Sequence, residues 1–149
     1  MKKIFLIISL LLTTTSNFAT KVIGCYFISV EDKWKSCRSY SIVFYENNNY
    51  EIGIERCPMD GEPIDDIKKT KRILSHGTFV RKGEDGVVLT EAVSGNKIQL
   101  RYIFVEYKPK TQDTIIKLPR WLKVEEGAKE LNDKTFSCLY DLYFDPPKR

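Results

Sequence analysis

YSIVFYENNNYEIGI, residues 40–54, is the stretch of sequence that decides the fold. Apolar residues alternate with other residues on both sides of the turn-forming run 46–49, a pattern typical of a β-hairpin. Placing the apolar residues of both strands on one face pairs Phe44 with Tyr50, Ile42 with Ile52, and Tyr40 with Ile54. The loop is then three residues long, and Asn48 can take the left-handed position that such a loop requires.

The same register brings two cysteines together. Extending the ladder places Cys37 opposite Cys57, and opposite residues of paired strands lie close enough for a disulfide. A register shifted by two residues leaves the two cysteines diagonal to each other, still nearly in reach. We therefore predict a Cys37–Cys57 bond that clamps the open end of the hairpin. The alternation of the strands puts this bond on the face away from the core.

Further strand patterns lie on both sides of the hairpin. Turn-forming residues bound strands expected over 22–30, 73–81, 87–90, 98–105, 115–122 and 136–144. Gly77 lies inside one of these strands, where a glycine marks a bulge or a bend. About eight short strands in about 130 residues predict a single all-β antiparallel sandwich or barrel. Helix is limited to one or two short segments, over 64–70 and 125–131.

The N-terminus predicts export. Lys2 and Lys3 precede an apolar run, Ile4–Leu12, and a polar stretch that ends at Ala19, which is the layout of a secretory signal peptide. A membrane span needs about 20 apolar residues, more than this run supplies. We expect residues 1–19 to be removed, with cleavage after Ser16 as the alternative. Residues 20–149 would then form one β-rich domain without a transmembrane span, in the periplasm or outside the cell.

The mature domain is expected to carry little net charge. Loss of the two leader lysines changes the formal charge from +4 to +2. A nucleic-acid partner usually needs a stronger basic bias, so none is expected. Val22-Ile23-Gly24-Cys25 resembles a lipobox, which makes a lipid anchor at Cys25 an alternative to simple export. The polar residues between the apolar run and this motif favour placing Cys25 in the first strand instead.

Several segments resemble lipocalin-like small secreted bacterial proteins. Ser75–Phe79 has their Gly-Thr-aromatic strand, Asp85–Thr90 their Gly/Asp turn and apolar-apolar-Leu-Thr strand, and Gly95–Leu100 the strand that follows. Gly24-Cys25-Tyr26 is similar to their Gly-x-Tyr opening. The resemblance spans residues 22–105 and implies an up-and-down barrel or half-barrel that encloses a small apolar ligand. If the sheet closes, the first and last strands become neighbours, which predicts Cys25–Cys138 as a second disulfide.

The residues that carry chemistry predict no enzyme. His76 is the single histidine, and nothing near it in sequence suggests a catalytic partner. The four cysteines are not closely paired as zinc ligands usually are, and in an oxidising compartment they are expected to form disulfides. Paired carboxylates such as Asp65-Asp66 lie in turns or charge runs, where solvation explains them. We expect neither a metal nor a cofactor.

Two functional hypotheses follow from the aromatic residues. In the first, the barrel holds a small apolar or amphipathic ligand inside, and the lining residues are the apolar-face positions Tyr26, Phe44, Ile52, Phe79, Leu100 and Tyr102. In the second, the interior is filled and the protein is an interaction module, such as an inhibitor or immunity-type partner of another exported protein. The contacts would then come from aromatic residues on polar faces or near strand breaks, namely Tyr45, Tyr107, Trp121 and Tyr143.

Overall fold

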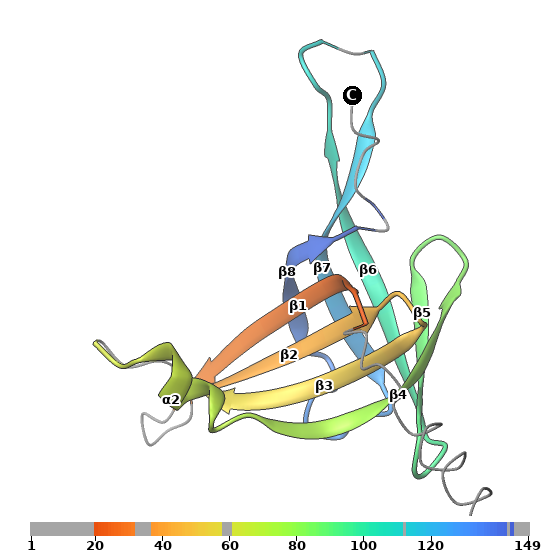
Figure 1. Cartoon of the computed structure of the whole chain (residues 1–149). Coiled ribbons are helices and arrows are strands. Elements are labelled where there is room, and N and C mark those ends of the chain that lie inside the picture. Colours follow the sequence, from red (N-terminus) through yellow and green to blue (C-terminus); the bar gives the residue numbers. More distant parts are fainter. Residues whose placement is uncertain (1–19, 32–36, 58–60, 112, 143, 145–149) are drawn as a thin grey trace, which may run out of the picture.

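The computed structural model describes residues 20–31, 37–57, 61–111, 113–142 and 144. Eight antiparallel strands follow one another in chain order and close into a barrel, so the predicted all-β fold is confirmed as a barrel rather than a sandwich (Figure 1). The predicted signal peptide lies outside the described residues. The elements are β1 (Val22–Glu31), β2 (Cys37–Tyr45), β3 (Asn49–Arg56), α2 (Ile64–Lys68), β4 (Arg72–Lys82), β5 (Gly86–Glu91), β6 (Lys97–Tyr107), β7 (Ile116–Glu126) and β8 (Thr135–Asp141).

The β2–β3 hairpin has the register predicted from its apolar pattern. Phe44 lies opposite Tyr50, Ile42 opposite Ile52, and Tyr40 opposite Ile54. Asn48 has a φ of 62° in the three-residue loop, as expected for a residue that closes the turn in the left-handed region. The alternation therefore determined the pairing, because a slip by one residue would have turned every apolar side chain of one strand toward solvent.

The predicted bond between Cys37 and Cys57 is present at the open end of this hairpin. Their Cα atoms are 5.2 Å apart, and the Cys57 N–H donates to the Cys37 carbonyl at 3.1 Å.

The second predicted disulfide, Cys25–Cys138, is wrong: both thiols are free in the structure. The two cysteines do lie on neighbouring strands, since closure makes β1 and β8 partners. A bulge between Cys25 and Tyr26 shifts the register of the β1–β8 pairing, so that Tyr26 rather than Cys25 lies opposite Cys138. Tyr26 points into the core, and Cys25 beside it therefore points outward while Cys138 packs against the core. The two sulfurs consequently lie on opposite faces of the sheet.

The helix predicted over 64–70 is present as α2, but the one predicted over 125–131 is not. Instead β7 continues to Glu126 because Val124 pairs with Leu100 of β6. Gly127 then turns the chain with a φ of 95°. A Cβ at Gly127 would lie 2.1 Å from the Lys97 carbonyl oxygen, so the backbone passes too closely for a helix former to replace it.

Gly77 is the point at which β4 changes its partner. Residues from Arg72 to Thr78 pair with β3, whereas the pairing with β5 begins at Gly77 and runs to Lys82. The bend predicted at Gly77 corresponds to this change of partner. The bulge lies three residues earlier in β4, at Leu74, because the consecutive residues Ile52 and Gly53 of β3 pair with Ser75 and Ile73. A Cβ at Gly77 would lie 2.0 Å from the carbonyl oxygen of Thr90, so only glycine allows the two backbones to approach this closely.

The β6–β7 hairpin extends beyond the barrel. Its ladder continues past Ile103 and Trp121 to the pair Tyr107 and Ile116. The neighbouring strands stop earlier, because β5 reaches only to Arg101 of β6 and β8 only to Trp121 of β7. Figure 1 shows the result, a two-stranded ribbon that projects from one end of the barrel.

Candidate functional site

The barrel interior is packed with side chains. The residues predicted to line a ligand cavity, namely Tyr26, Phe44, Ile52, Phe79, Leu100 and Tyr102, are all buried in one contiguous cluster. Their rings contact one another, with centroids 4.8 Å apart for Phe44 and Phe79, 6.0 Å for Tyr26 and Phe44, and 5.9 Å for Tyr26 and Tyr102. At these separations aromatic rings are in packing contact, so these side chains fill this part of the barrel themselves.

A buried ionic cluster closes the barrel end from which the ribbon projects. Asp141 is 5% exposed and accepts a hydrogen bond of 2.6 Å from the Tyr26 hydroxyl. The Arg81 guanidinium lies 3.8 Å from the same carboxylate and donates to the Tyr102 hydroxyl at 2.6 Å. Gly24 makes room for the cluster, because a Cβ there would lie 3.3 Å from both Asp141 and Phe44.

Aromatic rings surround the charged atoms of this cluster. The guanidinium carbon of Arg81 lies 5.2 Å from the ring centroid of Phe144, 5.4 Å from that of Tyr102 and 5.8 Å from that of Phe79. These contacts stabilise a cation that is largely removed from water. Burial and the nearby Asp141 carboxylate raise the pKa of Tyr26, and burial likewise raises the pKa of Tyr102. Both hydroxyls are therefore held protonated as members of the network.

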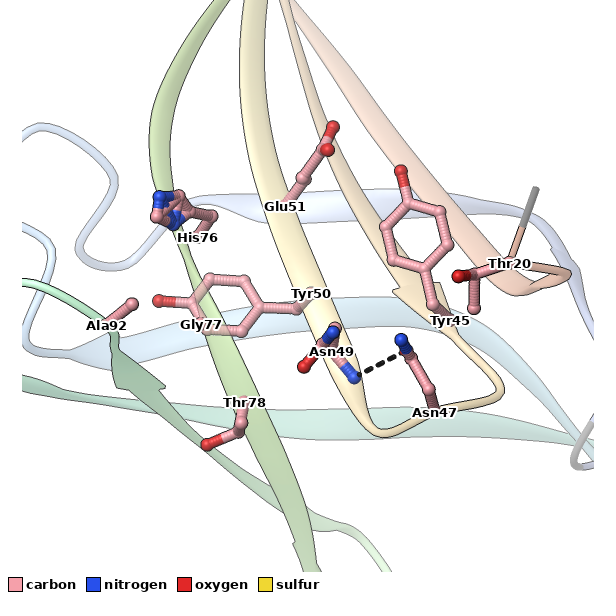
Figure 2. Close-up of a pocket in the computed structure, with 10 residues that line it drawn as sticks. All are labelled: Thr20, Tyr45, Asn47, Asn49, Tyr50, Glu51, His76, Gly77, Thr78 and Ala92. Atoms are coloured by element: carbon pink, nitrogen blue, oxygen red, sulfur yellow. Dashed lines mark hydrogen bonds between the residues drawn. The ribbon is translucent and has the colours of Figure 1, made fainter. Parts of the chain in front are cut away.

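An open pocket of about 610 Å³, lined mostly by residues that carry a polar group, lies on the outside of the barrel, across the β2–β3 turn and β4 (Figure 2). His76 lies directly opposite Glu51 on the neighbouring strand, and the Glu51 carboxylate also lies near Tyr45. Burial and this carboxylate raise the pKa of Tyr45. The pocket can form hydrogen bonds with a small polar molecule. Its lining residues are Thr20, Tyr45, Asn47, Asn49, Tyr50, Glu51, His76, Gly77, Thr78 and Ala92.

A smaller recess of about 290 Å³ opens at the barrel mouth, at the end opposite the ionic cluster. Ile52, Ile98 and Leu131 supply buried apolar walls. Glu91, Asn96 and Lys129 contribute polar groups to the lining. Its volume is at the lower limit for a small-molecule site. Ile52 is thus a predicted lining residue that does reach a pocket.

The aromatic residues predicted for an interaction face are separated by the fold. Tyr107 and Trp121 come together on one face of the projecting ribbon, as described next. Tyr45 lies instead in the pocket of Figure 2, on the β2–β3 side of the barrel. Tyr143 lies outside the described residues.

One face of the ribbon is apolar along its whole length, and we call it the ribbon face. Val105 lies opposite Leu118, Tyr107 opposite Ile116, and Ile103 opposite Trp121. Directly opposite residues share a face, and on β6 these positions alternate with Tyr102, which points into the barrel. On β7 the register shift between Ile103 and Phe104 skips Arg120, so Leu118 and Ile116 lie on the face of Trp121 although Leu122 points inward. Val105 is 37% exposed and Tyr107 54% exposed. The ribbon face therefore consists of Ile103, Val105, Tyr107, Ile116, Leu118 and Trp121.

The ribbon face continues around the barrel. Trp121 lies opposite Ser137 of β8, and Ser137 lies opposite Phe27 of β1, which is 40% exposed. The guanidinium of Arg120 lies 5.7 Å from the ring centroid of Trp121 at the border of the face. Sequence reasoning identified the two aromatic residues but missed their aliphatic neighbours. The pairing rule used for the first hairpin would have joined Val105 with Leu118 and Tyr107 with Ile116, but it would have missed Trp121, because a register shift between Ile103 and Phe104 places Trp121 opposite Ile103.

No family model, curated protein or solved structure matches this chain.

No described helix is both long and apolar enough to cross a membrane. Within the described ranges, no three His, Cys, Asp or Glu side chains are grouped as ligands for a metal ion.

Proposed function

We propose that this protein is an exported interaction module, a solid barrel that binds another protein through the ribbon face. The observation that carries this proposal is the continuous apolar surface on a ribbon that projects from the barrel. Exposed apolar patches of this kind mark binding sites for other proteins. An isolated two-stranded ribbon is only marginally stable in water. The extension therefore adds little to the stability of the fold, which favours a role in binding.

The packing of the interior supports the same proposal. The aromatic side chains expected to line a ligand cavity pack against one another within one buried cluster, which supports recognition through the outer surface. Trp121, Tyr107 and the adjacent Arg120 belong to the residue types that are enriched at protein interfaces. The Cys37–Cys57 bond and the leader-like residues 1–19 support a location outside the cytoplasm.

Site-specific photocrosslinking tests the proposal. A benzophenone amino acid at position 107 should capture a discrete partner when the protein is exported in its own cells. The matched control is the same probe at Arg38, which is exposed on β2. Capture at position 107 and not at position 38 is expected. Equal labelling at both positions, or no product above background at position 107, would count against the ribbon face as a binding site.

The barrel-mouth recess favours a second candidate function, binding of a small amphipathic ligand. Its apolar walls come from Ile52, Ile98 and Leu131, and its polar groups could hold a headgroup. Native mass spectrometry of the purified protein should then show an added mass that organic extraction removes. Leu74→Trp, at a half-exposed position in the recess wall, should abolish this adduct by filling the space. An adduct that persists in the variant would exclude the recess as its site.

A further inference from the structure

The two edges of the projecting ribbon differ in how they can receive another strand. On the β6 side, the Tyr102 N–H donates to the carbonyl oxygen of Asp85 at 2.7 Å. Backbone groups two residues apart in a strand point to the same side. Phe104 and Glu106 therefore direct their N–H and C=O groups away from β7. In the described part of the chain, strand pairing on this side of β6 ends at Arg101.

The β7 edge is blocked by its own residues. Pro119 lies opposite Phe104, and Lys117 lies opposite Glu106. These are the positions at which β7 also directs its backbone groups outward, so Pro119 removes the outward N–H without costing a bond to β6. Proline and lysine are the residues by which sheet edges resist further pairing. The ribbon thus has one protected edge and one edge that can accept hydrogen bonds and donate them.

We propose that the β6 edge from Phe104 to Tyr107 receives an extended segment of the partner protein as an additional strand. This inference rests on the proposed function and specifies how the ribbon binds. Main-chain hydrogen bonds to Phe104 and Glu106 would provide part of the affinity, as in other complexes formed by strand addition. Alternate side chains of the added strand would extend the ribbon face beside Ile103, Val105 and Tyr107.

The charges of the ribbon define the chemistry of that segment. Lys108, Lys110, Lys117 and Arg120 outnumber the two acids of the ribbon, Glu106 and Asp113. Lys108 lies 3.7 Å from Asp113, which leaves Lys110 at the tip for an incoming acid. At the base of the β6 edge, the β4–β5 turn instead carries Glu84 and Asp85. The segment that fits alternates apolar with polar residues and has acidic residues at the end that lies toward the ribbon tip.

Peptide selection tests this proposal with a defined probe. A phage-displayed library of linear decapeptides is panned on the full mature protein. Enriched sequences are expected to alternate apolar with polar residues and to carry Asp or Glu near one end. A synthetic copy of the best sequence is then titrated onto the protein and its variants.

Two matched variants separate the edges of the ribbon. Glu106→Pro removes an outward N–H from the β6 edge, and Lys117→Pro makes the same change at the position directly opposite on β7. Glu106→Pro should weaken peptide binding at least tenfold, whereas Lys117→Pro should leave it within twofold. The thermal midpoints of both variants are measured first, so that loss of folding is not taken for loss of binding.

Amide hydrogen exchange on the unaltered protein gives a readout that needs no variant. Peptide binding should slow exchange at Phe104 and Glu106 and leave Val105 and Tyr107 unchanged, because their N–H groups already point toward β7. Three outcomes would overturn strand addition: no enrichment of peptides, equal binding by Glu106→Pro, or protection without this alternation. Peptides that bind Glu106→Pro but lose binding to Tyr107→Ser would refute strand addition and leave the ribbon face as a binding surface.

Discussion

The stability of this protein above pH 10 should report the buried hydroxyl of Tyr26. That hydroxyl donates to Asp141 at 2.6 Å, and burial together with the carboxylate raises its pKa. In the unfolded chain a tyrosine ionises with a pKa of about 10. Above that pH the folded state holds a proton that the unfolded state has lost. The raised pKa therefore contributes stability that is complete below pH 10 and declines as the pH rises further.

The size of the effect follows from proton linkage. One proton more in the folded than in the unfolded state lowers the free energy of unfolding by about 1.4 kcal/mol per pH unit. Tyr26→Phe removes this titration and also leaves the buried Asp141 without one donor, at a cost of about 1–3 kcal/mol near pH 8. The variant should thus begin less stable and lose stability less steeply. Its disadvantage should shrink by about 1.4 kcal/mol per pH unit above pH 10.

Urea unfolding followed by far-ultraviolet circular dichroism measures both slopes, in half-unit steps from pH 8 to about 11.5. A background with Cys25→Ser and Cys138→Ser prevents alkaline thiol–disulfide exchange with the Cys37–Cys57 bond. Titration of Tyr102 is common to both proteins and cancels in the difference. Tyr107→Phe is the control, since more than half of that side chain is exposed. Parallel curves for Tyr26→Phe and its parent up to pH 11.5 would refute the reasoning.

Three further perturbations have expected outcomes. Replacing both Cys37 and Cys57 by Ala should lower the free energy of unfolding by about 3 kcal/mol, the chain-entropy value for a loop whose ends are 20 residues apart; urea titration measures this, and a loss near zero would contradict it. Arg81→Leu should cost about 3–5 kcal/mol because it leaves the Asp141 carboxylate buried without this cation, and a thermal midpoint equal to that of the parent would count against the cluster as described. Gly77→Ala should lower the free energy of unfolding by about 2–3 kcal/mol, since its Cβ would lie 2.0 Å from the Thr90 carbonyl oxygen. Unchanged hydrogen-exchange protection along β4 and β5 would show that the backbones of Gly77 and Thr90 do not approach this closely.

Local sequence patterns were sufficient to predict the parts of the fold that depend only on strands adjacent in the sequence. The β2–β3 register, the conformation of Asn48 and the Cys37–Cys57 bond all followed from one alternating stretch. The failures lie where distant segments meet. The bulge in the β1–β8 pairing separates Cys25 from Cys138, and no local pattern in the sequence signals this bulge.

The candidate site shows the same division. Tyr107 and Trp121 could be selected as exposed aromatics, but their common face depends on the pairing of β6 with β7. The projection of the ribbon depends on where β5 and β8 stop, which is a property of the whole barrel. The buried Asp141 and Arg81 were not anticipated, because an acid near the end of the last strand and a basic residue of a surface-like strand become partners only after closure. The helix expected over 125–131 failed because strand pairing overrode weak helix propensity.

The closure of the barrel by β1 and β8 also has a consequence for how the protein can be made. Tyr26 and Asp141 are separated by 115 positions in the chain, yet they share the hydrogen bond that seals one end of the barrel. Pairings of such long sequence separation form slowly, because the entropy of a large loop is lost before any contact forms. Strands β2 to β7 can pair as each emerges, but β1 has one edge without its partner until the last strand is synthesised. A chain that lacks β8 (Thr135–Asp141) would present the open edges of β1 and β7 to other chains, so this one strand decides whether folding gives a barrel or an aggregate.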